Sequence, residues 1–188
     1  MKKRRSIIIP ALALIMAICA VSFGNGEIKK EVTAYGPNAY LMFANGDWSV
    51  QNNGVESAKG ITVYPAEIRS EGFYSVALEF DIPSEGVSFA AIGIKNGEHD
   101  LPGATIRIDA IRINDKPIEF SKGYTTSDDG AETRMNIYRE WGGDVLPEEA
   151  RSWDGSLEGA SSMILDPALF MEVTLLEVDF TVFCPSQD

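Results

Sequence analysis

The sequence predicts an all-β protein, folded as an antiparallel β-sandwich of about nine strands with minimal helix. Three observations support this fold class. Apolar and polar residues alternate with the two-residue period of a half-buried strand, clusters of Gly, Asn, Asp and Pro separate the alternating segments, and no segment is helical for long enough to connect parallel strands. With 45% hydrophobic residues among 188, the chain can bury one sizeable core. We therefore expect two packed sheets in a single domain.

The strand predictions follow the alternation along the chain. The clearest case is residues 73–80, where Tyr74, Val76 and Leu78 alternate with polar or smaller residues. Turn signals such as Asn45-Gly46 separate one strand from the next. The same reasoning predicts the other strands at residues 39–44, 48–52, 61–64, 87–94, 105–113, 116–120, 133–139 and 172–183.

Two of these strands contain a break in the period. The four isoleucines of residues 106–113 are spaced two, three and two positions apart, which is one residue too many for a single face. We expect a β-bulge or a switch between sheets near Asp109. The C-terminal strand shows a similar slip near Leu175-Leu176, before alternation resumes.

Helix is expected only in short pieces. Residues 145–152 are expected to form one or two helical turns. Asp166-Pro167 provides an N-cap followed by proline at the first helical position, so residues 168–171 are expected to form a single turn.

The N-terminal segment has the organisation of an export signal. Residues 2–5 are all Lys or Arg, and residues 6–23 contain no charged side chain. This pattern matches the n-region and h-region of a signal peptide. We expect residues 1–24 to be the signal and residues 25–188 to be a single β-sandwich domain, located outside the cell or at the cell surface.

The fate of the signal has three interpretations. Small or tolerated residues favour cleavage between Ala20 and Gly24. Lipidation of Cys19 is a second possibility, although Ile18 stands where a small residue is preferred. Retention of the apolar run as a membrane anchor is the third, because its length just suffices to span a bilayer.

Charge excludes one broad class of partner. The chain carries 16 basic and 28 acidic residues, a formal net charge of -12, and loss of the four basic residues of the signal leaves 12 basic against 28 acidic, or -16. No general basic surface is present for DNA or RNA, and anionic surfaces are unfavourable partners for the same reason.

Cysteine and histidine give no sign of catalysis or of a metal site. Cys184 is the only cysteine of the expected domain, so no internal disulfide can form. We expect a half-buried thiol at the end of the last strand, with pairing to another chain as the alternative. His99, the only histidine, lies in a polar loop without a nucleophile motif. There is also no phosphate-binding loop and no zinc-ligand spacing.

The stretch at residues 123–141 has the densest set of candidate binding residues. Strand alternation predicts that Arg134, Asn136 and Tyr138 share one face, with Trp141 just beyond the strand. Aromatic rings stack on the apolar faces of sugars, while guanidinium and amide groups bond to sugar hydroxyls. The alternative is an ordinary solvated sheet face with cross-strand packing.

Four further features are weaker candidates. Tyr124 and Trp153 are included as possible ligand-binding rings. Trp48 is expected to be a core anchor, with exposure at a strand start as the alternative. The acidic cluster at residues 127–130 is expected to be a turn, although it could hold a structural calcium ion.

A resemblance to a known family rests on three segments: Ala-Tyr-Leu-Met-Phe-Ala at 39–44, Ile-Arg-Ile-Asp-Ala-Ile-Arg-Ile at 106–113 and Thr-Arg-Met-Asn-Ile-Tyr-Arg-Glu-Trp at 133–141. They resemble secreted β-sandwich domains of the carbohydrate-binding-module type from extracellular proteins of Gram-positive anaerobic bacteria. The resemblance covers residues 39–183. It implies a jelly-roll fold, a glycan or cell-wall polysaccharide as ligand, and no catalytic residues.

The sequence therefore predicts an exported, non-catalytic carbohydrate-binding protein without a cofactor, apart from the possible calcium ion. The first alternative is a structural or adhesion protein of the cell surface, whose exposed rings contact another protein. The second is a small glycoside hydrolase, because a chain with 28 acidic residues places some carboxylate pairs at catalytic distance by chance.

Overall fold

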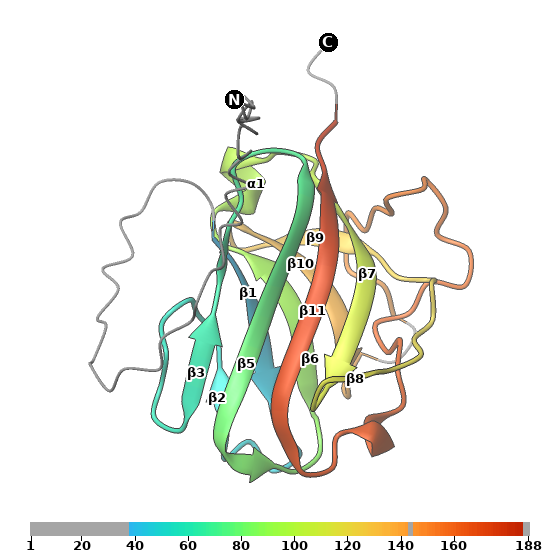
Figure 1. The fold of residues 1–188 in the computed structure, drawn as a ribbon. Coiled ribbons are helices and arrows are strands. Elements are labelled where there is room, and N and C mark those ends of the chain that lie inside the picture. The colour runs from blue at the N-terminus through green and yellow to red at the C-terminus, as the bar shows by residue number, and fades with distance from the viewer. Residues whose placement is uncertain (1–37, 143–144, 186–188) are drawn as a thin grey trace, which may run out of the picture. The chain divides into compact units, whose positions relative to one another are not determined.

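The computed structural model describes residues 38–142 and 145–185. The predicted signal at residues 1–24 therefore lies outside the described residues. The described chain is nearly all β and forms two antiparallel sheets, which confirms the predicted β-sandwich class (Figure 1). No described helix is long and apolar enough to cross a membrane.

The first sheet contains six strands. Its order is β2-β1-β6-β10-β9, and β4 pairs with the beginning of β1. The strands are β1 (Asn38–Ala44), β2 (Gln51–Asn52), β4 (Ala66–Glu67), β6 (Phe89–Ile94), β9 (Thr126–Asp129) and β10 (Glu132–Arg139).

The second sheet contains five strands in the order β3-β5-β11-β7-β8. Its long central strands β5, β11 and β7 lie in front of β1, β6 and β10 in Figure 1. The strands are β3 (Ile61–Tyr64), β5 (Gly72–Ser84), β7 (Thr105–Ile113), β8 (Lys116–Pro117) and β11 (Val173–Phe183).

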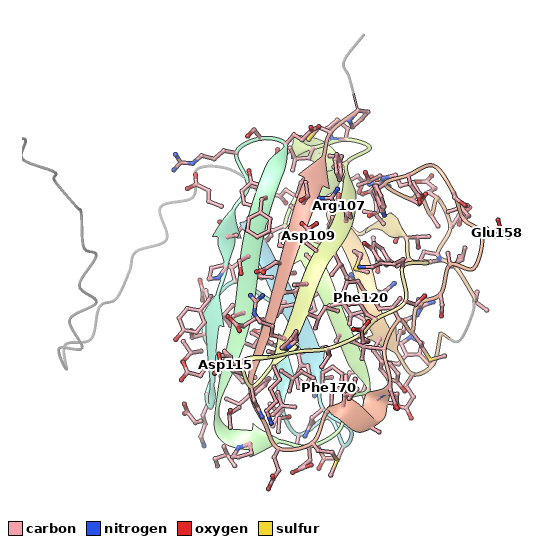
Figure 2. The ribbon with its side chains drawn as sticks, turned by 45° about the vertical axis from the view of Figure 1, so that its right-hand side comes forward. Arg107, Asp109, Asp115, Phe120, Glu158 and Phe170 are labelled. Atoms are coloured by element: carbon pink, nitrogen blue, oxygen red, sulfur yellow. The ribbon has the colours of Figure 1, made fainter. Side chains whose placement is uncertain are left out.

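The core lies between the two sheets. Leu41 and Ile92 of the first sheet and Leu78 and Phe180 of the second have no exposed surface. Phe170 packs near Phe43, with ring centroids 6.3 Å apart, and lies at the lower end of the sandwich in Figure 2. Burial of alternate residues is the consequence of the two-residue period, since successive strand side chains point to opposite faces.

The short elements differ from the predictions in several places, of which the unpredicted strand β4 is one. The strand at Thr126–Asp129 was expected to be a turn, and the α-helix α1 (Gly97–Asp100) was expected to be a loop. The helical turns expected at residues 145–152 are absent. There the backbone of Arg151 forms a β-bridge with Thr126 of β9, which requires an extended chain.

The other expected turn is confirmed. A 3₁₀ helix, η1, spans Pro167–Leu169, and the Asp166 side chain accepts a hydrogen bond from the backbone N of Ala168 at 2.9 Å. The aspartate therefore caps the helix, with proline at the first helical position.

Of the two alternatives expected near Asp109, a β-bulge or a switch between sheets, the structure shows the bulge. Asp179 of β11 lies opposite Ala110 and the next residue, Phe180, lies opposite Ile108, so Asp109 is the extra residue. The bulge allows the isoleucines on both sides of it to face the core. In Figure 2, Asp109 lies beside Arg107, whose Nε donates a hydrogen bond to it at 2.9 Å.

The slip expected near Leu175 also corresponds to an irregular pairing. Val173 lies opposite Ser84, whereas Leu175 lies opposite Glu79. The excess residues therefore belong to the partner strand β5 and not to β11.

Cys184, which follows β11, is partly exposed, as expected for a half-buried thiol. Burial and the nearby Glu71 raise the pKa of this thiol.

Candidate ligand-binding groove

The outer face of the first sheet points away from the second sheet. On this face, residues that are directly opposite one another on β1, β6 and β10 form rows across the strands. Residues that pair across antiparallel strands share a face, so the register of β1, β6 and β10 assigns these rows directly. The rows are Tyr40-Gly93-Arg134, Met42-Ala91-Asn136 and Ala44-Phe89-Arg139.

The strand β6 in this face carries small residues, and side chains of the neighbouring strand β1 pack over them. Gly93 and Ala91 occupy the middle of β6, and a Cβ atom on Gly93 would lie 3.1 Å from the Met42 Sδ and 3.2 Å from the Tyr40 Cζ. The neighbouring side chains therefore use the space over the glycine. The same face carries a groove with a volume of about 590 Å³, within the range of ligand pockets, which extends from Gln51 of β2 to strand β9.

One end of the groove is aromatic. The ring centroid of Trp141 lies 5.6 Å from that of Trp48 and 5.6 Å from that of Phe89. Trp141 is 60% exposed and Trp48 is 45% exposed. The three rings together, here called the aromatic wall, present apolar surface to solvent, which is unusual unless a ligand or partner uses it.

The exposure of Trp48 corrects the prediction that it anchors the core. Trp48 has a φ angle of 62°, in the left-handed region, within the turn that joins β1 to β2. Its backbone N donates to the Asn45 O at 3.2 Å, and the Asn45 side chain accepts from the Val50 N at 3.0 Å. The turn therefore holds the indole outside the sandwich.

The opposite end of the groove is polar and charged. Arg134 forms salt bridges to Asp129 at 2.5 Å and to Glu132 at 3.0 Å. The Tyr40 hydroxyl donates a hydrogen bond to Glu132, and burial together with this carboxylate raises the pKa of the phenol. Arg134 is thus held by two acids. Its Nε is buried without an acceptor among the described residues.

Asn136 and Arg139 lie between the two ends. The Asn136 side chain lines the groove and has no hydrogen-bond partner among the described residues. Arg139 lines the groove beside Phe89, and its Nη2 donates to the backbone O of Val145 at 3.0 Å. Both side chains therefore keep hydrogen-bonding capacity for a ligand.

The prediction that Tyr138 shares a face with Arg134 and Asn136 is wrong. Asn136 lies opposite Ala91 and Tyr138 lies opposite Ala90, so Ile137 is an extra residue in β10 and forms a second bulge. The bulge turns Tyr138 towards the core, where it is 9% exposed. Arg139 takes the outward position instead.

The structure also places Tyr124 in the core. It is 2% exposed, and its hydroxyl accepts a hydrogen bond from the Ile108 N at 2.7 Å. This part of β7 is a sheet edge, and Thr126 Oγ1 likewise accepts from the Ile106 N at 2.9 Å. The two side chains satisfy edge donors that would otherwise stay unpaired inside the protein.

Trp153 lies on the second sheet, away from the groove. Its ring stacks on Phe183 with a centroid distance of 6.2 Å, and the Arg107 guanidinium lies 5.5 Å from the Trp153 centroid. Of the six residues predicted to bind ligand, Arg134, Asn136 and Trp141 line the groove, whereas Tyr138, Tyr124 and Trp153 do not.

Both carboxylates of the acidic cluster at residues 127–130 are bound to arginines. Asp128 accepts from Arg151 at 2.9 and 2.8 Å, and Asp129 pairs with Arg134. The hairpin turn falls at Gly130-Ala131, where both φ angles are positive. Within residues 38–142 and 145–185, no group of three His, Cys, Asp or Glu residues is placed to hold a metal ion.

A second hollow lies on the outer face of the second sheet. Its volume is about 610 Å³, and its charged lining residues are the acids Glu79, Asp115 and Glu177. Its one exposed ring, Tyr64, donates a hydrogen bond to Glu79 at 2.7 Å. His99 is exposed in α1 and lines neither hollow.

Sequence reasoning missed Phe89, Trp48 and Arg139 as groove residues. A signal for Arg139 exists in the adjacent apolar pair Ile137-Tyr138, which breaks the alternation of the strand just as the isoleucine spacing does in β7.

Comparison of the chain with protein-family models, with curated proteins and with solved structures finds no match.

Proposed function

We propose that this protein is a non-catalytic carbohydrate-binding protein, and that its ligand occupies the groove on the first sheet. The observation that carries the proposal is the aromatic wall of Trp141, Trp48 and Phe89 beside Asn136, a largely buried side chain that lines the groove. Rings provide area for stacking on a pyranose, and the amide can both donate to and accept from hydroxyls.

The shape of the groove favours a chain of sugars over a single one. Its lining residues come from every strand of the path from β2 to β9. With neighbouring strands about 4.8 Å apart, five strands span roughly 19 Å. An oligosaccharide laid across the strands would contact the aromatic wall with some rings and the polar end with others.

A non-catalytic role agrees with the state of the carboxylates at the polar end. Asp129 and Glu132 are both engaged by Arg134, and Asp128 is engaged by Arg151, so Glu148 is the one acid among the described lining residues without a partner. A glycosidase needs one carboxylic acid that can donate a proton and a second carboxylate free to act as base or nucleophile. We propose that the same groove releases no reducing sugar from the polysaccharides it binds.

The proposed function also requires that the domain reaches polysaccharides outside the cytoplasm. A signal peptide at residues 1–24 would deliver the domain to the cell surface or the medium, where polysaccharides of cell walls are available. Binding by such an open groove should be weak, because hydroxyls exchange water for protein with little net gain.

The test is calorimetric titration of the purified domain with polysaccharides that bind wild type on a glycan array. Trp141→Ala should abolish detectable binding and leave the thermal midpoint nearly unchanged, because the ring is mostly exposed. Trp153→Ala is the matched control, since it removes a loop tryptophan that packs on Phe183 of the other sheet and should retain binding.

Unchanged affinity in Trp141→Ala would refute the assignment of the groove. Absence of binding to every glycan, combined with capture of a surface protein that depends on Trp141, would favour the adhesion alternative.

A further inference from the structure

Arg139 differs from the other arginines of the described chain. Each of the others forms a salt bridge with at least one carboxylate, namely Arg69, Arg107, Arg112, Arg134 and Arg151. Arg139 pairs with no carboxylate in residues 38–142 and 145–185. In a chain with 28 acidic and 16 basic residues, an arginine without an acidic partner is unexpected.

The surroundings of Arg139 leave its charge only partly compensated. Its one side-chain hydrogen bond in the described structure goes from Nη2 to the Val145 O at 3.0 Å. Its Nε is buried without an acceptor, and no described residue accepts from its Nη1. A half-buried guanidinium in this state has a strong preference for an anionic acceptor.

The position of Arg139 suggests what that acceptor is. Arg139 lies opposite Phe89 in the register, and both line the groove together with Trp141. A ligand whose sugar ring stacks on the aromatic wall would have its substituents beside the guanidinium. A carboxylate is the sugar substituent that matches the planar, charged donor group of arginine.

We propose that the groove recognises a uronic acid unit within a glycan, with Arg139 binding its carboxylate and Trp141 stacking on its ring. This inference rests on the proposed function and specifies its ligand. Arg134 does not serve the same purpose, because Asp129 and Glu132 already neutralise it.

The negative charge of the protein limits which uronic glycans fit. The net charge, -12 for the full chain and -16 without the four basic residues of the signal, repels a polyanion, but screening over a Debye length of about 8 Å restricts that repulsion at physiological salt. Glu148 also lines the groove, where its exposed carboxylate has no partner among the described residues. Arg139 is a single cation near the acidic Glu148, so it can compensate one carboxylate but not a row of them. Single uronic units spaced along a neutral chain therefore fit the groove better than a continuous polyuronate.

The experiment compares matched ligands. A xylan with glucuronic acid side groups, an oligogalacturonate and a glucuronic acid-containing heteropolysaccharide are each titrated before and after reduction of their carboxyl groups to primary alcohols. Neutral glycans from the array are titrated alongside. Carboxyl reduction preserves the ring and removes the charge, so it isolates the contact with Arg139.

We expect at least one uronic glycan to bind. Reduction of its carboxyl groups should weaken binding about tenfold or more, which is the size of one charge-assisted contact. Arg139→Gln should cause the same loss and bind the native and reduced forms equally. Arg69→Gln, which changes the net charge equally at an exposed site remote from the groove lining, should behave as wild type. Glu148→Gln should strengthen binding of the native form.

Equal binding of native and reduced forms by wild type, or binding of neutral glycans alone, would overturn the uronic acid inference and leave carbohydrate binding standing. Binding of no glycan, neutral or acidic, would overturn both. Should Arg139→Gln fail to fold, the comparison of native with reduced ligand on wild type and on Arg139→Lys still decides the question.

Discussion

The contact between Arg151 and Asp128 provides a quantitative test of how the sandwich holds residues 145–166, which connect to η1 without forming a strand. The Arg151 guanidinium donates to both oxygens of Asp128 at 2.9 and 2.8 Å and to the backbone O of Ala104 at 2.9 Å. The side chains of Arg151 and Asp128 are 22% and 15% exposed. Removing one partner of a largely buried pair leaves the other charge uncompensated, which costs about 3 kcal/mol at the lower end of the known range.

Arg151→Gln should therefore lower the free energy of unfolding by about 3 kcal/mol at neutral pH, as measured by urea denaturation. Arg69→Gln, which breaks a pair with Glu67 at an exposed arginine, should cost much less, because solvent screens an exposed ion pair. The double variant Asp128→Asn, Arg151→Gln should lose less than the two single variants added together, because it leaves no unpaired charge.

The stabilisation by the pair of Arg151 and Asp128 should depend on pH. Burial opposes ionisation of Asp128, but hydrogen bonds from Arg151 and Thr133 outweigh it and hold the pKa of this carboxyl below its usual value. The stabilisation is present above the unfolded-state pKa and is lost as the pH falls through the lower, folded-state value. The difference between wild type and Arg151→Gln should therefore shrink in acid. A difference that is constant from neutral pH to about pH 3, or absent throughout, would refute this reasoning.

Three further predictions concern the bulges and the signal. Ile108→Asp and Ile111→Asp should each unfold the domain, because the bulge directs both side chains into the core, and wild-type urea stability in either variant would mean that the register is wrong. Tyr138→Phe should leave glycan affinity unchanged in calorimetry, since Tyr138 faces inwards. A large loss of affinity would mean that the Tyr138 hydroxyl contacts the ligand after all. Intact mass of the exported protein should show a chain that begins between residues 21 and 25, whereas a full-length mass or a lipid on Cys19 would contradict cleavage.

The predictions of strands were most reliable where burial alternates clearly. β3 and β7 occupy the expected residues, because their apolar period records which side chains reach the core. The short strands β4 and β9 were missed. Thr126–Asp129 is polar and acidic, and it forms a strand because β10 pairs with it and Arg151 neutralises Asp128. Such tertiary partners leave no periodic signal.

The candidate site was predicted only in part for a related reason. Arg134, Asn136 and Trp141 were placed correctly in one region by strand alternation, but the alternation was carried through the bulge at Ile137, so Tyr138 was assigned in place of Arg139. In β7, by contrast, the spacing of the isoleucines is itself enough to indicate the extra residue.

The sequence by itself determined the fold class, the presence of an extra residue near Asp109 and the capped turn after Asp166, because each follows from the period or chemistry of neighbouring residues. Only the tertiary structure decided which rings meet. Trp48 and Trp141 are 93 positions apart in the chain yet lie 5.6 Å from each other, since a left-handed turn exposes one and the end of β10 presents the other. Contacts between distant segments depend on strand register and bulge position, and a single residue of either changes which side chains share a face.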